Sequence, residues 1–472
     1  MQPSIFNVRV PLEDRGEVFL MNTFTDAQLL VSEEVAALLE RTRTAGAGPN
    51  PPEAGWSDAE QEALATLAEH GFLASGREEE RAKLTKYFRD VREGTDQVRV
   101  TVLTTLQCNF ACDYCFQGDH GDYNKFAQKM SLETAAGVVA WAEAKLDALR
   151  PESFVLTLFG GEPLLNLPVC YFLAERLWAA CQARGVRLLV NVITNGLLLT
   201  PAVVDRLAPY GLNGVKITLD GDRDTHNRMR PLRGGQGTFD KILENVRLVA
   251  DRCKVSIGGN FDESSAGSYP ALLDFLREQD FADKLAKVAF KPIIRQTPKT
   301  PKGLIPLTAV DGSGKPLGGT CMTVAGTGTT SACTGCGGLD ETLTFLREET
   351  KRRGFPTVDG VHMGPCELHK RHAYTLNPDG SIYACPGFTG DQTQSVGHID
   401  DRQDPLRARA AAEWDVLAPW KSCGDCPFIP VCAGGCSVAS HTELGSMHMP
   451  NCHKTSFEAG VTALARDAAA AH

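Results

Sequence analysis

The sequence predicts an α/β protein whose central part is a partial (β/α)6 barrel. Six apolar, strand-like runs recur between residues 98 and 291, and amphipathic helical stretches separate them. Strands that alternate with helices pair into a parallel sheet with the helices outside it, and ligand-handling residues then lie at the carboxyl ends of the strands. The expected strands are Val98–Leu103, Phe154–Phe159, Arg187–Ile193, Gly214–Leu219, Lys254–Gly258 and Ala286–Lys291.

The elements before the barrel predict a small separate unit. The runs Phe6–Val10 and Val18–Met21 flank a charged turn, as in a hairpin, and Ser57 precedes the second of two amphipathic helices. A charged segment, Arg77–Arg92, then leads into the barrel. The expected segments of the 472-residue chain are a unit over 1–95, the barrel over 96–295, a Gly/Thr-rich linker and insertion over 296–365, a cysteine-rich domain over 366–455 and a tail over 456–472.

Charge and hydropathy exclude several classes of protein. The chain has 48 basic and 58 acidic side chains and a net charge of −10, which argues against wrapping nucleic acid or lying on anionic lipid. No run of about 18 apolar residues is long enough to span a bilayer, and the first residues lack the apolar core of a signal peptide. We therefore expect a soluble cytoplasmic protein, with no nucleic-acid or membrane partner.

Sixteen cysteines are the most informative feature of the composition. Clustered thiols in a reducing compartment are more often metal ligands than disulfides. Cys108, Cys112 and Cys115 lie on one short loop after the first strand, where three thiolates can bind three irons of a [4Fe–4S] cubane and leave the fourth iron open. Structural zinc generally takes four protein ligands, so the open cluster fits this loop better.

This loop, with its aromatic residue Tyr114 before the third cysteine, resembles the CxxxCxΦC signature of the radical S-adenosylmethionine (SAM) superfamily. The resemblance implies a TIM-like partial barrel in which Tyr114 lies against the adenine of SAM. It also implies further SAM contacts at the ends of later strands. These are Gly160, Gly161, Glu162 and Pro163 (GGEP, at the amino group), Thr194 and Asn195, Asp220 and Arg230 (ribose and carboxylate) and Asn260 (adenosine). An alternative for Arg230 is a turn cap.

Seven further cysteines follow Pro365 at the spacing Cx13Gx4C, then CxxC, Cx5C, Cx3C and a last cysteine. This pattern resembles the SPASM domain, which holds two auxiliary [4Fe–4S] clusters. By that resemblance Cys366, Cys385 and Cys436 hold the first, and Cys423, Cys426, Cys432 and Cys452 hold the second. The alternative interpretation of CxxCx5C is a zinc knuckle.

The remaining cysteines and nearby histidines stay open at this point. Cys321, Cys333 and Cys336 complete the first auxiliary cluster, form a further metal site or are unpaired thiols. Apolar surroundings favour packed thiols for Cys170, Cys181 and Cys253. Metal ligation by His441, His448 or His453 is the weaker hypothesis against surface or packed histidines.

The resemblance implies an oxidoreductase that cleaves SAM to a 5′-deoxyadenosyl radical and modifies or crosslinks a residue of a ribosomally made peptide. Residues 1–95 resemble winged-helix-like units that bind leader peptides at a sheet edge, with a structural cap on the barrel as the alternative. The implied partners are a peptide or protein substrate and an electron donor such as flavodoxin or ferredoxin.

Three other functions remain as hypotheses. An anaerobic sulfatase-maturing (formylglycine-generating) enzyme shares the same parts, but its family has an acidic base where this chain has Pro386, with Asp379 and Asp391 nearby. A metal-stapled adaptor predicts zinc and no iron. An ordinary SAM-dependent methyltransferase predicts a Gly-rich Rossmann turn, which the sequence lacks.

Overall fold

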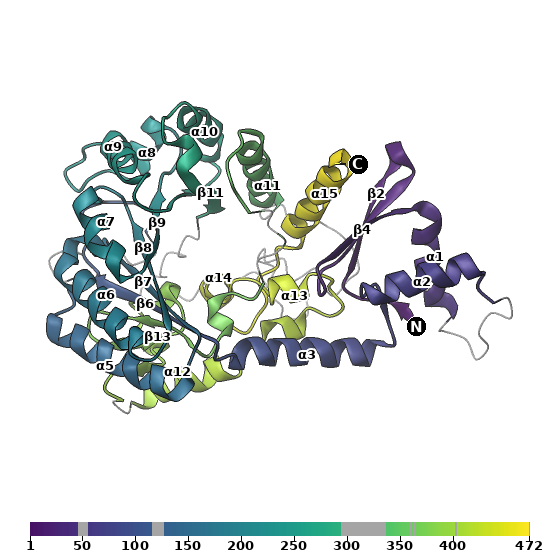
Figure 1. Ribbon diagram of the computed structural model, residues 1–472, viewed down its shortest axis with the longest axis horizontal. Helices are drawn as coiled ribbons and strands as arrows, with labels where there is room; N and C mark the ends of the chain where they lie inside the picture. The colour runs from purple at the N-terminus through teal and green to yellow at the C-terminus, as the bar shows by residue number, and fades with distance from the viewer. Residues whose placement is uncertain are drawn as a thin grey trace, which may run out of the picture.

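The computed structural model describes residues 1–45, 55–115, 127–293, 337–358, 361, 364–401 and 404–471. Its largest element is a sheet of nine strands in the order β11-β10-β9-β8-β7-β6-β12-β13-β14 (Figure 1). Six of these strands pair in parallel in chain order, which confirms the α/β fold and the expected barrel strands. They are β6 (Gln97–Thr105), β7 (Ser153–Gly160), β8 (Arg187–Thr194), β9 (Leu212–Thr218), β10 (Val255–Phe261) and β11 (Leu285–Pro292).

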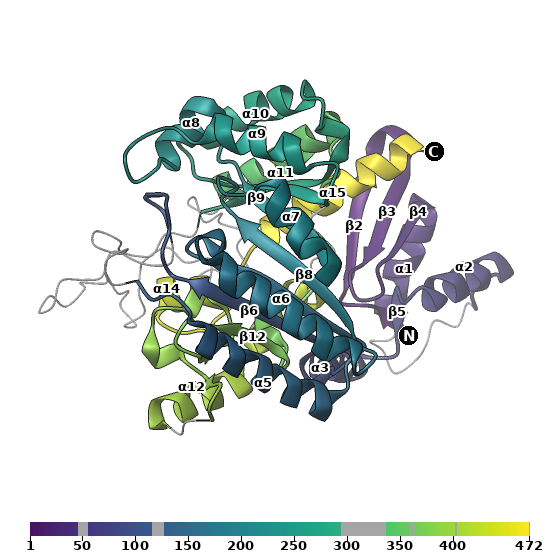
Figure 2. The ribbon, with the colours of Figure 1, turned by 60° about the vertical axis from the view of Figure 1, so that its left-hand side comes forward.

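Helices cover one face of this sheet because alternate strand residues are apolar. In β6, Val98, Val100 and Val102 are buried in the main core, whereas Thr101 between them faces the inner side. Figure 2 shows α5 and α6 lying along the same face of the sheet. The helices of this layer are α5 (Leu132–Leu149), α6 (Leu167–Gln182), α7 (Pro201–Leu207), α8 (Arg223–Met229), α9 (Phe239–Val249) and α10 (Tyr269–Arg277).

One more helix, α11 (Gly337–Arg352), belongs to the same layer although it lies beyond the expected boundary at residue 295. Leu346 of α11 and Phe355 just after it are buried in the main core. The amide of Val288 in β11 donates to the carbonyl of Pro356 at 2.8 Å, which ties the segment after the helix to the last parallel strand.

The N-terminal unit is a three-stranded antiparallel sheet with helices on one side. The sheet contains β2 (Asn7–Leu12), β3 (Glu17–Asn22) and β4 (Ala27–Ser32), with β3 in the centre. The predicted hairpin is β2–β3, and β4 extends it. The helices α1 (Glu33–Ala45) and α2 (Asp58–Glu69) pack on this sheet beside a two-residue strand pair, β1 (Gln2–Pro3) with β5 (Leu73–Ala74).

The charged segment that follows is a single helix, α3 (Arg77–Glu93), which runs from the N-terminal unit to the barrel along the C-terminal region (Figure 1). Its buried residues Glu80, Leu84 and Phe88 recur every four positions and form one stripe. Phe88 stacks on Trp420 with ring centroids 4.6 Å apart. The helix therefore packs against the C-terminal region instead of acting as a loose link.

The C-terminal region is built from short elements and joins the barrel sheet at β6. Strand β12 pairs in parallel with β6, and β13 and β14 extend the sheet in antiparallel order. The second face of the N-terminal sheet packs on the last helix through Phe19, Met21 and Phe457. The elements are β12 (Ala373–Leu376), β13 (Ser381–Tyr383), β14 (Gly397–His398), α12 (Pro405–Asp415), α13 (Ile429–Cys432), α14 (Ser437–Leu444) and α15 (Lys454–Ala471).

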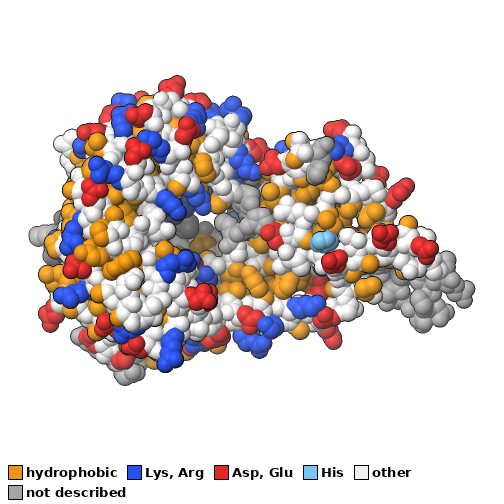
Figure 3. Space-filling view, viewed as in Figure 1, with side chains coloured by type: hydrophobic (Ala, Val, Ile, Leu, Met, Phe, Trp, Pro, Cys, Tyr) orange, Lys and Arg blue, Asp and Glu red, His pale blue; other side chains and the backbone are white. Residues whose placement is uncertain are grey.

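Acidic and basic side chains are interspersed over the described surface in the view of Figure 3. Within the described ranges, no helix is both long enough and apolar enough to cross a membrane.

Candidate active site

The three-cysteine loop leaves the carboxyl end of β6 and is held by the segment that follows α8. The amide of Ala111 donates to Pro231 O at 2.9 Å, and the amide of Arg233 donates to Asn109 O at 3.1 Å. Between these bonds Phe110 forms an isolated bridge with Leu232. Residues 109–111 of the loop are thus paired with residues 231–233, so the loop that carries Cys108, Cys112 and Cys115 has a rigid support.

The base of the loop passes very close to the two glycines at the end of β7. The amide of Gly161 donates to Thr105 O and the amide of Glu162 to Gln107 O, both at 2.8 Å. A Cβ on Gly160 would lie 2.2 Å from Thr105 O, and one on Gly161 would lie 2.2 Å from Gln107 O. Glycine is required here because backbone meets backbone. The two glycines therefore let the end of β7 approach the base of the cysteine loop.

Glu162 is completely buried and joins the ends of β7 and β8. Its Oε1 accepts hydrogen bonds from the Thr194 hydroxyl at 2.7 Å and the Leu164 amide at 3.0 Å, and its Oε2 accepts from the Asn195 amide at 2.8 Å. Burial raises the pKa of this carboxyl, and these donors oppose the rise. Glu162 thereby positions Thr194 and Asn195, and Pro163 after it begins a short 3-10 helix.

Asn195 carries the connection on to the cysteine loop. Its side-chain amide donates to Asn109 Oδ1 at 2.7 Å, while its own Oδ1 accepts from the Leu197 amide at 3.0 Å. The predicted residues at the ends of β7 and β8 are therefore brought next to the loop, and the structure gives Glu162 and Asn195 positioning roles within the protein.

A polar cluster joins the last part of the loop to the ends of β9 and β10. The Tyr114 hydroxyl donates to Asp220 Oδ2, and Arg230 Nη1 lies 2.5 Å from the Tyr114 oxygen and 3.5 Å from Asp220 Oδ2. The amide of Asn260 donates to Asp220 Oδ1 at 2.7 Å, and its side chain donates to the Tyr114 oxygen at 3.2 Å. Four predicted site residues thus form one network, and the backbone amide of Arg230 also caps α8 by donating to His226 O at 2.7 Å.

His226, which the sequence analysis did not single out, supports this network through hydrogen bonds to its backbone and to Thr238. Its Nδ1 accepts from the Asp220 amide at 3.1 Å, and its Nε2 lies 3.0 Å from the Thr238 hydroxyl, which donates to Arg230 O at 2.9 Å. This chain needs the neutral ring with hydrogen on Nε2. Burial and the nearby Arg230 lower the pKa of His226 well below its usual value, which favours that form.

Electrostatic effects link the seven C-terminal cysteines in two sets. Burial is the largest effect that raises the pKa of Cys385, and the charges of Cys366 and Cys436 also raise it. The pKa of Cys432 is raised by burial, which is the largest effect, and also by a second set of thiols. That second set is Cys423, Cys426 and Cys452.

A pair of glycines after Cys432 allows the second group to assemble. Gly435 has φ +87°, and a Cβ there would lie 1.8 Å from Asn451 O. The amide of Asn451 donates to Gly434 O at 2.8 Å. Because no side chain intervenes, the segment that carries Cys452 lies directly against the segment that carries Cys432.

Comparison with known proteins gives matches over the barrel. The model of the radical SAM superfamily matches residues 102–261, which contain the cysteine loop and the ends of β7 to β10. The matched part of this chain is similar to the radical SAM domain. The superfamily uses SAM and a [4Fe–4S] cluster, so the loop of Cys108, Cys112 and Cys115 and the polar cluster beside it lie in the domain that carries this chemistry.

Two curated relatives match part of this chain. It is 26% identical over 192 residues to an Fe-coproporphyrin III synthase of Methanosarcina barkeri, a match that covers 40% of this chain and 42% of that one. It is 32% identical over 146 residues to a GTP 3′,8-cyclase of Synechococcus, covering 30% and 39%. The matches thus span about two fifths of each relative's length.

The solved structures of anSMEcpe with bound AdoMet share the fold over most of the chain. Superposition gives a TM-score of 0.56 at 19% identity and covers 78% of this chain and 99% of the other. A second anSMEcpe structure, with AdoMet and the peptide Kp18Cys, gives the same TM-score at 18% identity, with 78% and 98% coverage.

The radical SAM site contains a donor set that fits a cluster and its ligand. Burial raises the pKa of Cys108 to about 12 and that of Cys112 to about 11. The described neighbours do not offset this effect of burial on the thiolates. Bound iron would stabilise the thiolates, because a metal displaces the thiol proton. Arg230 Nε is buried and has no hydrogen-bond partner among the described residues. Such a donor is costly unless a ligand accepts from it. The carboxylate of SAM has the chemistry to do so.

Single metal ions fit these cysteines less well. No three His, Cys, Asp or Glu side chains of the described ranges are grouped so that they could hold a metal ion. In a cubane each thiolate binds a different iron, so the thiols surround the cluster without converging on one point.

Several predicted residues take no part in this arrangement. Cys321, Cys333 and Cys336 lie outside the described residues. Cys170 and Cys181 are buried within the main core, which confirms them as packed thiols, and Cys253 is partly buried. His441 packs edge-on against Phe388.

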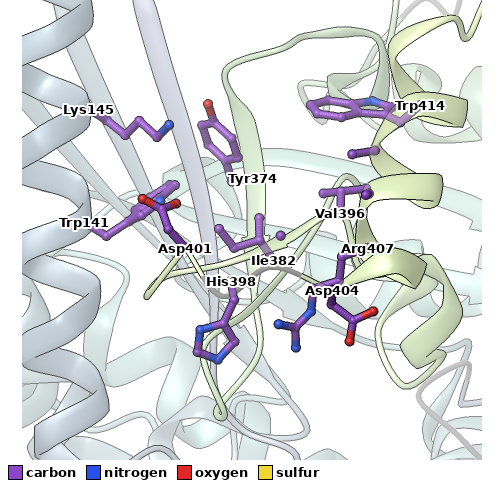
Figure 4. A pocket seen from close by; sticks show the side chains of 13 residues that line it. Trp141, Lys145, Tyr374, Ile382, Val396, His398, Asp401, Asp404, Arg407 and Trp414 are labelled. Carbon is purple, nitrogen blue, oxygen red and sulfur yellow. The ribbon is translucent and has the colours of Figure 1, made fainter.

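A cavity of about 330 Å³ lies elsewhere, between α5, α12 and the strands β12 to β14 (Figure 4). Trp141 and Tyr374 pack edge to face on one side of it, and Arg407 and Trp414 come from α12 on the other (Figure 4). Neither the cysteine loop nor the polar cluster lines it, so it is separate from the radical SAM site.

Proposed function

We propose that this protein is a radical SAM maturase that oxidatively modifies or crosslinks a residue of a ribosomally made peptide. The observation that carries the proposal is the packing of the N-terminal unit on the second cysteine group. The Thr23 hydroxyl donates to Pro427 O, and Arg81 pairs with Asp425 at 3.0 Å. Cys426 packs on the same cluster as Phe19 of the N-terminal sheet.

Cys108, Cys112 and Cys115 would hold a [4Fe–4S] cluster, and Arg230 would bind the carboxylate of SAM. When bound and reduced, this cluster supplies one electron that cleaves SAM and yields the 5′-deoxyadenosyl radical that removes hydrogen from the substrate. The chain's own contribution is to orient these groups through Glu162, His226 and the Asp220–Tyr114 pair, and to exclude water from them. Asn260, Thr194 and Asn195 complete the proposed SAM surroundings.

The two C-terminal cysteine groups would hold two further [4Fe–4S] clusters, as in a SPASM domain, for three in all. The first group has three cysteines among the described residues, so its fourth iron is open or takes a ligand from another part of the chain. These clusters would accept the electron left after a substrate bond forms, and flavodoxin or ferredoxin would reduce the SAM-binding cluster.

The N-terminal unit would bind the leader of the peptide. Strand β4 is an edge of its sheet, and within the described residues no strand pairs with the outer side of β4. An extended peptide can add to such an edge through backbone hydrogen bonds. The peptide-bound anSMEcpe structure shows that a protein of this fold accommodates a peptide together with AdoMet.

Anaerobic reconstitution tests the proposal. The holoenzyme should contain about twelve irons per chain, since each of three cubanes holds four. With dithionite and SAM it should form 5′-deoxyadenosine, and replacing Cys108, Cys112 and Cys115 together by Ala should abolish the product. A colourless zinc protein would instead be a metal-stapled adaptor, and product from the triple variant would reject the cluster assignment.

The shared fold with anSMEcpe supports one second hypothesis, an anaerobic sulfatase-maturing enzyme. Asp379 and Asp391 are the acidic residues nearest to Pro386 in the sequence. Each accepts a hydrogen bond within a local turn: Asp379 from the Ser381 amide at 3.0 Å, and Asp391 from the Thr393 amide at 2.9 Å. Formylglycine from a sulfatase-derived cysteine peptide would establish this alternative. Its absence, with a modified leader-bearing peptide, supports the maturase.

A further inference from the structure

Three lysines gather on the inner face of the barrel sheet, away from the helices. Parallel pairing places Lys216 of β9 beside Ser256 of β10, and Ser256 beside Lys287 of β11. Residues two positions apart on a strand share a face, so Lys291 of β11 lies on this face too, four residues after Lys287. We call Lys216, Lys287 and Lys291 the lysine wall.

The wall is built around a row of small residues. Gly258 of β10 pairs with Thr218 on one side and Ala289 on the other, between the level of Lys216 and the level of Lys291. A Cβ at Gly258 would lie 2.7 Å from Lys216 Cε and 3.5 Å from its Nζ. The Lys216 side chain therefore lies across Gly258.

The three ammonium groups have no counter-ion in the described structure. All three residues are accessible to solvent on the inner face, and no described carboxylate forms an ion pair with any of them. Partial desolvation by the surrounding barrel, which is the largest effect, and the charges of Lys291 and Lys287 together lower the pKa of Lys216 to about 8. Like charges held together without partners repel one another, and an anionic ligand would relieve this repulsion.

The wall adjoins the polar cluster at its Lys291 end. Lys291 pairs in register with Asn260, which donates to Asp220 and Tyr114 in the polar cluster. A substrate group that binds at the wall would therefore lie next to the proposed SAM site.

We propose that Lys216, Lys287 and Lys291 form an anion subsite that binds a carboxylate side chain of the peptide next to the residue that is modified. The inference rests on the proposed peptide substrate, because the acidic group must belong to a chain that extends into the barrel. Lysine suits this role, since its flexible ammonium accepts several carboxylate positions without fixed geometry. The neighbouring Ser256 adds a hydroxyl donor at the same level.

The test uses the reconstituted holoenzyme with SAM and two acetylated hexapeptides, one of alternating Gly and Glu and one of alternating Gly and Gln. Calorimetry should show tighter binding of the Glu peptide, and raising the salt concentration should reduce the preference. Lys216→Met and Lys287→Met should each weaken binding of the Glu peptide about tenfold, since a charged hydrogen bond is lost. Lys287→Arg should retain most of the affinity.

Lys241→Met is the matched control, because Lys241 is an exposed lysine of α9 that pairs with Glu244 outside the barrel. It should not change the affinity. Equal affinity for the two peptides, or equal losses in Lys241→Met and Lys287→Met, would overturn the subsite. Inorganic phosphate that competes as well as the Glu peptide would show a free-anion site and also overturn it. Absence of 5′-deoxyadenosine from the unaltered holoenzyme rejects the proposed function instead.

Discussion

Replacing Glu162 by Gln should loosen the joint between β7 and β8. The carboxylate accepts three hydrogen bonds and is 0% exposed. In the variant the side-chain NH2 group replaces one carboxylate oxygen. It must then face either the Asn195 amide or the Thr194 hydroxyl and Leu164 amide. At least one charge-assisted hydrogen bond is therefore lost, and a buried donor is left unpaired. The cost is about 2–4 kcal/mol.

Hydrogen exchange followed by mass spectrometry measures this cost locally. Peptides that contain the Leu164 and Asn195 amides should exchange about 30- to 700-fold faster in Glu162→Gln, because 1.4 kcal/mol corresponds to about tenfold. Glu152→Gln is the control, since Glu152 is an exposed side chain just before the same strand. Unchanged exchange in Glu162→Gln would reject the positioning role.

Three further predictions concern other joints. Gly435→Ala should lower the iron content by about four iron atoms per chain, because the new Cβ would lie 1.8 Å from Asn451 O. In the control Gly445→Ala the new Cβ has no neighbour within 4 Å, so the iron content should not change. The pKa of His226 is lowered in the folded protein, so the neutral ring stabilises the fold. This stabilisation is complete above about pH 6.5 and is lost as the pH falls below that value. Thermal unfolding should show this pH dependence in the unaltered protein but not in His226→Gln. Trp420→Ala should cost about 3–5 kcal/mol and expose α3 to proteases; an unchanged digestion pattern would contradict the packing on Phe88.

The sequence predicted the barrel strands well because their signal is local. In β6 to β11 apolar residues recur where helices cover the sheet, and this pattern survives without knowledge of any partner. The strands β12 to β14 were not expected to join the sheet, since they are only two to four residues long and gain their order from long-range pairing with β6. Strand β4 was also missed, although it has six residues and pairs with the adjacent β3.

In the candidate site too, the residues with a local sequence pattern were predicted, and those that depend on long-range contacts were not. Cys108, Cys112, Cys115 and the seven C-terminal cysteines were found from their spacing. The contribution of His226 depends on hydrogen bonds to Asp220 and Thr238, which only the folded chain brings together. The helical nature of α3 was available in the sequence, in the four-residue spacing of Glu80, Leu84 and Phe88, although its charge obscured it.

The lysine wall also required the structure. Lys216 and Lys287 are separated by about 70 residues of sequence and become neighbours only through the register of β9, β10 and β11. Charge in the sequence is scattered, and no run of basic residues marks this surface.

Electron paramagnetic resonance of the reduced, reconstituted protein tests the central claim most directly. If the cluster on Cys108, Cys112 and Cys115 leaves one iron without a protein ligand, adding SAM should change the spectrum of that cluster, and Arg230→Met should weaken the response because the carboxylate partner is lost. A spectrum that is the same with and without SAM would contradict the account.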